Sequence, residues 1–375
     1  MVRAIGIDPG TKSMDVFGFD DKTNEIIIDE PINRDEITKN PTLIMDILEN
    51  LDADAIVGPS GYGLPLMRAR DAKISEIHMA TFITDEDYRR RLKIVGLREL
   101  MIMMKNSKMN IYFTPGVIHL STVPEYRKAN KIDMGTADKL FSVVFGIKDQ
   151  AELYNIGYSE VSFILLEIGF GYTAAMTADK GKVVDGIGGT AGGIGYMGMG
   201  ALDSELAYAM ANTIDDFSKL ILFSGGTAFL SGIDPLKTTP EEFVKSNRGK
   251  TAYKAFIESA VKDLSFLLPS VRRPREILLS GRFTRIKPFL EDLKLEIQKF
   301  LHGIGIEAEI RTLKRRAKNA KEGAEGAAIL ANGIAKGRYL PLIENMELRN
   351  SSGTVFDHIY LNSDIKKKIR EKFMK

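Results

Sequence analysis

Two short turns of this sequence combine a carboxylate with glycines and hydroxyl side chains. The first is Asp8-Pro9-Gly10-Thr11-Lys12-Ser13, and the second is Glu167-Ile168-Gly169-Phe170-Gly171-Tyr172-Thr173. Glycine lets a backbone pass close to a ligand, and successive N–H groups in such a turn form a concave anion site. A carboxylate cannot bind phosphate itself, but it can hold Mg²⁺, usually through waters, and the metal then binds phosphate oxygens. An acid beside an anion-binding turn therefore predicts a metal–phosphate site, whereas an ordinary hairpin also explains either turn alone.

The two turns lie in matching surroundings. When the sequence is shifted by 159 positions, Asp8 falls on Glu167 and Gly10 falls on Gly169. Each turn joins β-branched, apolar runs that are typical of strands. The runs predicted as strands are 3–8, 13–20 and 25–29 in the first half, and 161–167, 172–179 and 182–185 in the second. Two copies of one three-strand opening favour function over chance, because two anion-binding turns can hold a polyphosphate from both sides.

Two later segments are candidates for contacts with a nucleotide. Residues 186–200 are unusually rich in glycine, yet their other side chains are mostly apolar. Flexible linkers are polar, so this composition indicates a backbone that passes close to a ligand or a neighbouring strand. The strand predicted over 276–280 enters a Ser-Gly-Arg turn before a helix, at the strand end where ligands collect in open α/β sheets. A plain strand-to-helix turn is the alternative for this second segment.

Asp138 lies in the first turn of a predicted helix that begins with Gly135-Thr136-Ala137. A carboxylate there is stabilised by the helix dipole, which is the structural explanation for its presence. The functional alternative is a general base facing a substrate hydroxyl. The four histidines are scattered, and no two of them have the i, i+4 spacing of helical metal ligands.

The composition sets the class of protein. A chain of 375 residues predicts two or three domains, and its net charge of +2 argues against a dedicated nucleic-acid binder. The absence of cysteine excludes disulfides, thiolate metal sites and iron–sulfur clusters. No apolar run is long enough for a membrane span, and the first residues run directly into a strand without a signal peptide. We therefore expect a cytoplasmic enzyme without a membrane or nucleic-acid partner.

The rest of the chain alternates between helices and strands, which predicts an α/β fold. Helices are predicted over 42–51, 85–105, 251–268, 286–300 and 319–336, and further strands over 54–58, 108–113, 276–280 and 306–310. The predicted domains are a first lobe over 1–150 and a second lobe over 151–337. The last residues, 338–375, end in a basic segment and are predicted to form a C-terminal appendage.

These motifs resemble those of the superfamily that contains acetate kinases, sugar kinases, heat-shock-type chaperones and actin. The turns at Asp8 and Glu167 look like its two phosphate motifs, and 278–282 looks like its adenosine motif. Residues 136–139 and 323–328 look like its two connecting helices. The chain is more closely similar to an archaeal group labelled predicted butyrate kinases. It departs from the superfamily pattern at Glu167, where Asp is usual, and at Arg282, where Gly is usual.

The resemblance implies two ribonuclease-H-like domains with a nucleotide cleft between them. It further implies ATP and Mg²⁺ as cofactors, with Asp8, Glu167 and Asp138 as catalytic residues and the first two of these as metal-orienting acids. The cofactor-binding residues implied are Gly10, Thr11, Lys12, Ser13, Gly169, Gly171, Thr173, Gly188, Gly189, Ser280, Gly281 and Arg282.

The function implied is an ATP- and Mg-dependent kinase that phosphorylates a short-chain carboxylate such as butyrate. The loop over 58–65 is the expected acceptor pocket, with Ser60, Tyr62 and Arg68 as substrate contacts. Because a carboxylate is already ionised at neutral pH, it needs no general base, whereas an alcohol does. The alternatives are a sugar or alcohol kinase and a nucleotide-driven switch with slow ATPase activity. The partners expected are a small-molecule substrate and, as an open question, a second copy in a homodimer.

Overall fold

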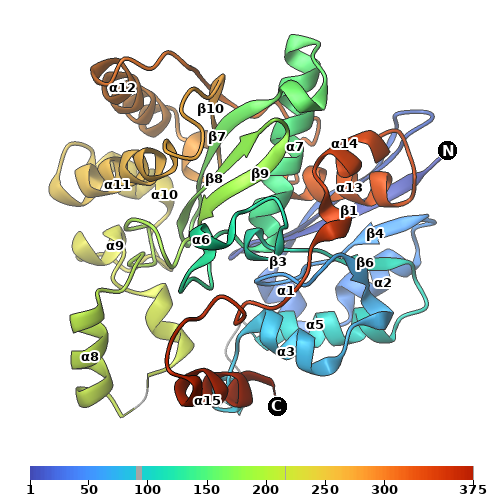
Figure 1. The fold of residues 1–375 in the computed structure, drawn as a ribbon, viewed down its shortest axis with the longest axis horizontal. Helices are drawn as coiled ribbons and strands as arrows, with labels where there is room; N and C mark the ends of the chain where they lie inside the picture. Colours follow the sequence, from blue (N-terminus) through green and yellow to red (C-terminus); the bar gives the residue numbers. More distant parts are fainter. Residues whose placement is uncertain (90–94, 216, 375) are drawn as a thin grey trace. The chain divides into compact units, whose positions relative to one another are not determined.

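The computed structural model describes residues 1–89, 95–215 and 217–374, which belong to two compact units (Figure 1). The first unit comprises Met1–Val161, Lys180–Val184 and Lys314–Lys375, and the second comprises Ser162–Asp179 and Asp185–Leu313. The strands are β1 (Arg3–Pro9), β2 (Ser13–Asp20), β3 (Ile26–Asn33), β4 (Ala55–Val57), β5 (Met67–Arg68), β6 (Ile111–Phe113), β7 (Ser162–Ile168), β8 (Thr173–Asp179), β9 (Lys182–Ile187), β10 (Glu276–Ser280) and β11 (Glu309–Thr312). The α-helices are α1 (Arg34–Lys39), α2 (Leu43–Glu49), α3 (Ile74–Thr81), α4 (Asp85–Arg89), α5 (Val95–Asn106), α6 (Glu125–Lys128), α7 (Ala137–Tyr154), α8 (Ser204–Thr213), α9 (Thr227–Leu230), α10 (Pro240–Asn247), α11 (Thr251–Leu267), α12 (Lys287–Gly303), α13 (Glu322–Ile334), α14 (Leu340–Asn345) and α15 (Ser363–Met374).

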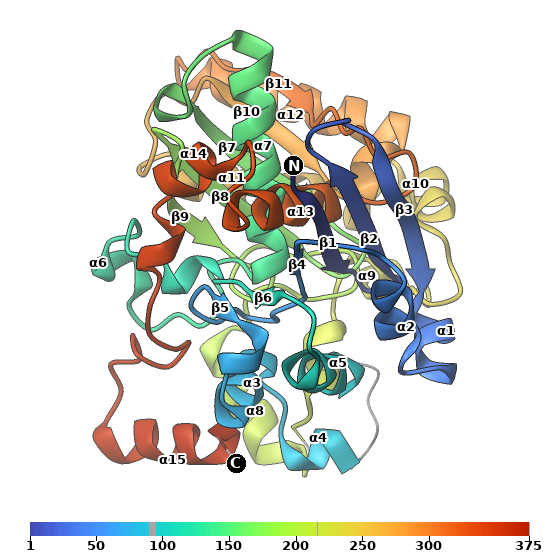
Figure 2. The ribbon, with the colours of Figure 1, turned by 90° about the vertical axis from the view of Figure 1, so that its right-hand side faces the viewer.

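The first unit is built on a mixed sheet in the order β3-β2-β1-β4-β6-β5. Its strands β1 and β2 form an antiparallel hairpin in which Asp8 pairs with Asp15 (Figure 2). The strands β4 and β6 continue the sheet parallel to β1. Because the carboxyl ends of parallel strands meet at one edge, the turn after β1 and the loop after β4 lie at the same edge of the sheet.

The second sheet repeats this plan in the order β11-β10-β7-β8-β9. The strands β7 and β8 form the equivalent antiparallel hairpin, and β10 and β11 continue parallel to β7. β7 spans the same number of residues as β1 and begins 159 positions later, so the predicted internal repeat is confirmed. The chain is an α/β protein with two ribonuclease-H-like domains.

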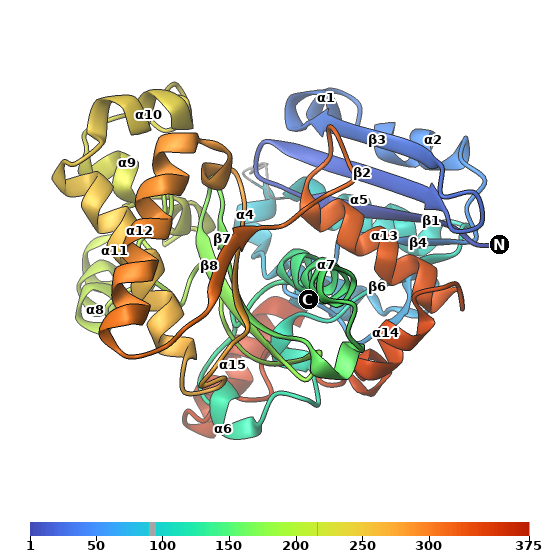
Figure 3. The same cartoon turned by 90° about the horizontal axis from the view of Figure 1, so that it is seen from above.

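Helix α13 lies between β1 and α7, and its backbone packs closely against the backbones of both (Figure 3). A Cβ atom on Gly6 of β1 would come within 2.2 Å of the Ala328 nitrogen, and one on Gly326 would come within 1.9 Å of the Phe141 carbonyl oxygen. Every residue of α13 is buried. The alanines and glycines of this helix are therefore required by close packing, which also fixes the amino ends of α7 and α13 relative to β1.

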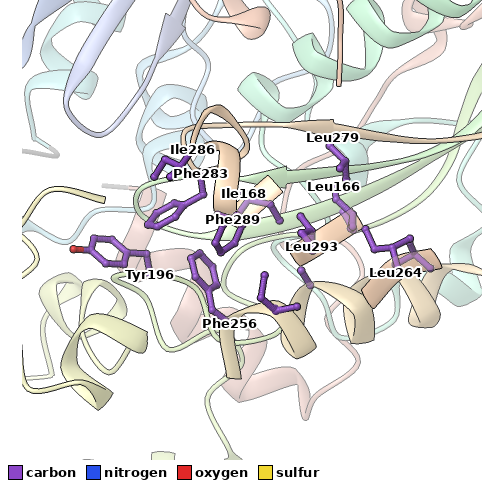
Figure 4. Close-up of a cluster of buried hydrophobic side chains, with 14 of the residues drawn as sticks. Leu166, Ile168, Tyr196, Phe256, Leu264, Leu279, Phe283, Ile286, Phe289 and Leu293 are labelled. Atoms are coloured by element: carbon purple, nitrogen blue, oxygen red, sulfur yellow. The ribbon is translucent and has the colours of Figure 1, made fainter. Parts of the chain in front are cut away.

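The core of the second unit contains aromatic rings packed among aliphatic side chains (Figure 4). The ring centroids of Phe256, Phe283 and Phe289 lie 4.8–5.3 Å apart, in tilted and edge-to-face pairs. Such pairs contribute roughly 0.5–1.5 kcal/mol each beyond the burial of their area. These rings pack α11 and α12 with Leu166 of β7 and Leu279 of β10, so the turn that follows β10 is held by a rigid core.

The C-terminal segment packs into the first unit. Leu342, Met346 and Phe356 are buried, and Phe373 of α15 stacks on Phe82 with centroids 4.1 Å apart. Residues 314–337 also belong to this unit, because α13 supplies apolar surface that covers β1. These ranges differ from the predicted second lobe over 151–337 and appendage over 338–375, since sequence patterns do not show which sheet a terminal helix covers.

Most predicted elements lie where the periodicity placed them. The strand over 276–280 and the helix over 251–268 match β10 and α11 within one residue. The helix predicted over 85–105 corresponds to α4 and α5, and residues 90–94 lie outside the described part of the chain. Within the ranges that the structure covers, no helix has the length and apolar character needed to cross a membrane.

Candidate functional site

The turn after β1 is a tight one. The Gly10 nitrogen donates to the Asp8 carbonyl oxygen at 3.1 Å, which turns the chain back toward β2. Thr11 and Lys12 are exposed at its tip, and Ser13 is half-buried. The predicted phosphate-binding residues of the first unit therefore lie together on one hairpin, at the carboxyl edge of the sheet.

The Asp8 carboxylate lies in an unusual environment. Its residue is 7% exposed, and its carboxylate accepts no hydrogen bond from the described residues. It lies over Gly323 in the first turn of α13, where a Cβ would come within 2.8 Å of Oδ2. Burial raises the Asp8 pKa to about 7, with Lys321 opposing the shift and Asp138 and Asp15 adding to it. A nearly buried carboxylate without a donor fits a cation, which would satisfy its charge.

Asp15, the partner of Asp8 across the hairpin, is fully satisfied. Its Oδ1 accepts from the Ser13 hydroxyl at 2.5 Å, and its Oδ2 accepts from the Lys321 backbone nitrogen at 2.9 Å. The Lys321 ammonium lies 3.2 Å from Asp15 Oδ1 and donates to the Ser13 hydroxyl at 3.2 Å. Lys321 is the N-cap of α13, so the start of that helix brings a positive charge to the first hairpin.

Arg34 brings a second positive charge to the same hairpin. Its Nε donates to the Gly10 carbonyl oxygen at 3.1 Å, and its backbone nitrogen donates to the Lys12 carbonyl oxygen at 3.0 Å. Desolvation lowers the Arg34 pKa, while the charge of Asp8 acts in the opposite direction. Arg34, Lys321 and Asp15 were not among the predicted site residues. An acid in an otherwise apolar strand was a signal for Asp15, whereas no local pattern marked the two cations.

Asp138 is held in its ionised form. Its Oδ1 accepts from the Thr136 hydroxyl at 2.5 Å, and its Oδ2 accepts from the Lys139 ammonium at 2.7 Å. Burial would raise the pKa of Asp138, but the Lys139 charge and these hydrogen bonds outweigh burial and lower it. The charge of Asp138 in turn raises the pKa of Asp8.

The predicted acceptor loop joins this edge of the sheet. The Gly61 carbonyl oxygen accepts from the Ala137 nitrogen at 3.1 Å, so the loop contacts the start of α7. Ser60 is fully buried, and its hydroxyl donates to the Gly58 carbonyl oxygen and accepts from the Thr114 nitrogen. The geometry thus gives Ser60 a structural role in shaping the loop, and its expected substrate contact stays a prediction. Tyr62 is half-buried against Phe82, and Arg68 is exposed on β5.

A small cavity lies beneath this loop. It has a volume of about 20 Å³ and is lined by Gly63, Leu64, Glu76 and His119 among others. This volume fits about one water molecule. His119 is buried, and among the described residues its Nδ1 has no hydrogen-bond partner. The cavity therefore suits a bridging water. It is too small for the expected acceptor, whose position stays a prediction.

We expect His119 to weaken the folded state on the acid side of neutrality. Burial lowers its pKa to about 4, below the ordinary value of 6.5. The unfolded chain thus binds a proton as the pH falls below about 6.5, while the folded chain binds it only near pH 4, so stability is lost over that interval. When the pH is lowered from 7 to 5, the free energy of unfolding of His119→Leu should fall by about 1–3 kcal/mol less than that of the wild type, as measured by urea unfolding. An equal loss in both proteins would contradict this assignment.

The second unit presents its own hairpin. The Gly169 nitrogen donates to the Tyr172 carbonyl oxygen at 2.9 Å, and Glu167 at the end of β7 is half-buried beside Ser280 of β10. Gly281 has a φ of +97°, and a Cβ there would come within 2.5 Å of the Ile168 carbonyl oxygen. The 280–282 turn and the Glu167 hairpin therefore lie side by side, as the two predicted nucleotide motifs of this unit require.

The glycine-rich segment packs against the same hairpin. The nitrogens of Met197 and Gly198 donate to the Gly171 carbonyl oxygen, and a Cβ on Gly189 would come within 2.3 Å of the Tyr172 side chain. Gly188 accepts from two nitrogens of a tight turn. Of the two predicted alternatives, a ligand or a neighbouring strand, the structure shows a close approach to the turn between β7 and β8, and a ligand contact stays a prediction. Both Gly188 and Gly189 are buried.

Two predicted contacts of the second unit have other surroundings in this structure. Thr173 is fully buried, and within the described ranges its hydroxyl has no partner. Arg282 forms an ion pair with Glu241 of α10 at 2.5 Å. The ion pair accounts for the position of Arg282, whereas the buried Thr173 hydroxyl is left without a partner among the described residues. The roles of both residues in nucleotide binding stay predictions. In the described part of the chain, no three His, Cys, Asp or Glu residues are grouped as a metal site.

A family model covers most of the chain. A model described as "Protein of unknown function (DUF1464)" matches residues 6–361. The chain belongs to the DUF1464 family. No curated protein sequence matches it.

The DUF1464 chain is similar in structure to two carboxylate kinases. A propionate kinase from Francisella tularensis subsp. tularensis SCHU S4 has a TM-score of 0.59 and 12% identity, covering 88% of this chain and 98% of that one. An acetate kinase from Entamoeba histolytica has a TM-score of 0.53 and 13% identity, covering 80% and 87%. This likeness confirms the expected fold, and the closer resemblance to predicted butyrate kinases stays a prediction.

Proposed function

We propose that this DUF1464 protein is an ATP- and Mg²⁺-dependent kinase that phosphorylates a short-chain carboxylate such as butyrate. The Asp8 carboxylate carries the proposal. It is nearly buried, accepts no hydrogen bond from the described residues and lies at a hairpin where Lys321 and Arg34 supply positive charge. A negative group that fits a cation, next to positive groups that fit an anion, is the arrangement expected for a metal–nucleotide complex.

The chemistry proposed is a direct phosphoryl transfer. A carboxylate oxygen of the acceptor forms a bond to the γ-phosphorus of ATP, and the bond to the β–γ bridging oxygen breaks. The electron pair of that bond leaves with ADP, and an acyl phosphate is formed without proton transfer. Magnesium, when bound, neutralises the charge of the phosphate oxygens. Asp8 would orient it, and the hairpin at Gly10 would position the phosphates.

The state of Asp138 favours a carboxylate acceptor over an alcohol. A general base works best when its pKa lies near the working pH. The Lys139 ammonium and the Thr136 hydroxyl instead lower the Asp138 pKa, so this carboxylate is a weak base. The roles of Glu167, of the second hairpin and of Ser280–Arg282, together with a homodimer and a cytoplasmic location, remain proposals with support from the sequence alone.

A screen of ATP consumption with Mg²⁺ tests the proposal. The acceptors are short fatty acids, hydroxy acids, sugars and polyols, and hydroxylamine traps any acyl phosphate. We expect ADP and trapped acyl phosphate with a short fatty acid. ADP formation with a sugar or polyol alone would indicate an alcohol kinase. ATP hydrolysis that no small molecule changes would indicate a nucleotide-driven switch.

Asp138→Asn separates the two kinase hypotheses. For a carboxylate acceptor, we expect kcat to fall by about 10-fold or less, because no proton must be removed. For an alcohol acceptor, kcat should fall by about 10²–10⁴-fold while nucleotide still binds. Glu152→Gln is the control, since this carboxylate of the same helix has 58% of its side chain exposed and pairs with Lys148. Steady-state kinetics with each acceptor measures the difference.

A further inference from the structure

Two cations from distant parts of the first unit converge on Gly10. Arg34 follows β3 and reaches the Gly10 carbonyl oxygen through Nε. Lys321 precedes α13, and its ammonium lies 2.2 Å from the position that a Gly10 Cβ would occupy. Glycine at this position therefore leaves space that the ammonium uses. The hairpin is flanked by two positive charges that its own sequence does not contain.

The two cations differ in how they are held. Lys321 is anchored by Asp15, which accepts from its backbone nitrogen and pairs with its ammonium. Arg34 makes one side-chain hydrogen bond, through Nε, and no described residue bonds its two terminal nitrogens. The guanidinium is thus oriented by Gly10 while its forked end is available. Such a fork matches two oxygens of a phosphate group.

We infer that Arg34 and Lys321 bind the terminal phosphate of a nucleoside triphosphate at the first hairpin. The Arg34 terminal nitrogens supply the directional contact, and the Lys321 ammonium supplies a point charge fixed by Asp15. This inference rests on the proposed function for the identity of its ligand. It adds two phosphate-binding residues that lie outside the motifs of the hairpin itself.

The position of the cations explains how the site balances its charges. The charges of Asp15 and Asp138 both raise the pKa of the Asp8 carboxylate, so three acidic groups influence this site. An anionic phosphate could not enter such a site without compensating positive charge. Arg34 and Lys321 provide it on the hairpin, and the Lys139 ammonium neutralises Asp138 at 2.7 Å.

Calorimetry with four ligands tests the inference: MgATP, MgADP, AMP and magnesium pyrophosphate. The variants are Arg34→Gln, Arg34→Lys and Lys321→Gln. Lys39→Gln is the matched control, because it removes one exposed positive charge from α1, the helix that begins with Arg34. Because the chain has no tryptophan, heat of binding is a better signal than intrinsic fluorescence.

We expect Arg34→Gln and Lys321→Gln each to weaken MgATP binding by about 10- to 100-fold, which is the range for a lost charge-assisted contact. AMP binding should change by less than about 3-fold, because AMP lacks the terminal phosphate that the two cations bind. Arg34→Lys should fall between the wild type and Arg34→Gln, since it keeps the charge and loses the fork. Lys39→Gln should bind all four ligands like the wild type.

The outcomes separate this inference from the proposed function. If the Arg34 and Lys321 variants lose affinity equally for MgATP and AMP, or lose none, the inference is overturned. The proposed function is still supported in that case, provided that the wild type binds MgATP. Pyrophosphate binding that depends on Arg34 and Lys321 without nucleotide binding would support the phosphate site and contradict the kinase. If the wild type binds neither nucleotide nor pyrophosphate, both fail. Circular dichroism identifies an unfolded variant, and Arg34→Lys and Lys321→Gln then decide the result.

Discussion

Asp8→Asn is expected to abolish MgATP-dependent turnover and at the same time to stabilise the ligand-free protein above neutral pH. The loss of turnover follows from the proposed role of Asp8 as the acid that orients the cation, and we expect a fall of about 10²–10³-fold or more. The gain in stability follows from burial, since the Asp8 carboxylate is 7% exposed and accepts no hydrogen bond from the described residues. An amide removes a charge that only the bound ligand would satisfy.

The pH dependence of this effect has a definite sign. Burial raises the Asp8 pKa to about 7, whereas the unfolded chain has the ordinary value of 3.8. Between these values the folded state holds a proton that the unfolded state has released. Raising the pH from about 4 to about 7 therefore destabilises the native protein, and Asp8→Asn lacks this loss. Urea unfolding at pH 5 and at pH 8 measures the effect. Between these pH values the free energy of unfolding of the variant should fall by about 1–3 kcal/mol less than that of the wild type.

A matched control separates burial from charge alone. Asp52 is a carboxylate at the surface with 96% of its side chain exposed, where it pairs with Arg3. Asp52→Asn should leave turnover unchanged and follow the wild-type pH dependence. If Asp8→Asn shows the same pH dependence of stability as the wild type, burial does not destabilise the charged form of Asp8. If it retains turnover, Asp8 is not part of the reacting site.

The sequence predicted the hairpins of this site more completely than it predicted the charges around them. Asp8 and Gly10 stand in one local turn, and the shift of 159 positions to Glu167 identified the second copy. These features depend on neighbouring residues, so their spacing survives in the sequence. The matching strand orders of the two sheets confirm that the repeat extends beyond the turns.

The two missed cations of the site reach the hairpin through long-range contacts. Lys321 lies 308 residues after Ser13, yet its ammonium donates to the Ser13 hydroxyl at 3.2 Å. Arg34 lies 24 residues after Gly10 and directly follows β3, the strand at the edge of the sheet. No periodicity or local motif reports which distant helix start meets which turn. That information is contained in the packing of α13 against β1, which depends on the whole unit.

Two polar residues predicted to bind ligands, Ser60 for the substrate and Arg282 for the cofactor, show a different limit. Ser60 belongs to the loop that is predicted to hold the acceptor, and in the structure its hydroxyl joins Gly58 and Thr114. Arg282 was chosen for its place after β10, and it pairs with Glu241 of α10. A polar side chain near a strand end serves either a ligand or its own loop. Only the contacts of the folded chain separate these two uses.

Gly326→Ala is expected to have the largest effect on stability of any substitution considered. In an exposed helix, replacing glycine with alanine stabilises by about 0.5–1 kcal/mol, because glycine loses more backbone entropy on folding. At Gly326 the added Cβ would lie 1.9 Å from the Phe141 carbonyl oxygen of α7, which belongs to a rigid backbone. The two helices must then separate, and we expect a loss of at least about 3 kcal/mol or failure to fold.

Gly303→Ala provides the opposite sign in the same experiment. Gly303 ends α12 in the second unit, and a Cβ there meets no atom within 4 Å. We expect it to increase the free energy of unfolding by about 0.5–1 kcal/mol, and so to raise the melting temperature slightly. A neutral Gly326→Ala would show that α7 and α13 can move apart without cost. Their amino ends, which carry Asp138 and Lys321, would then have no fixed position relative to Asp8, and the proposed site would lose the scaffold that its charges require.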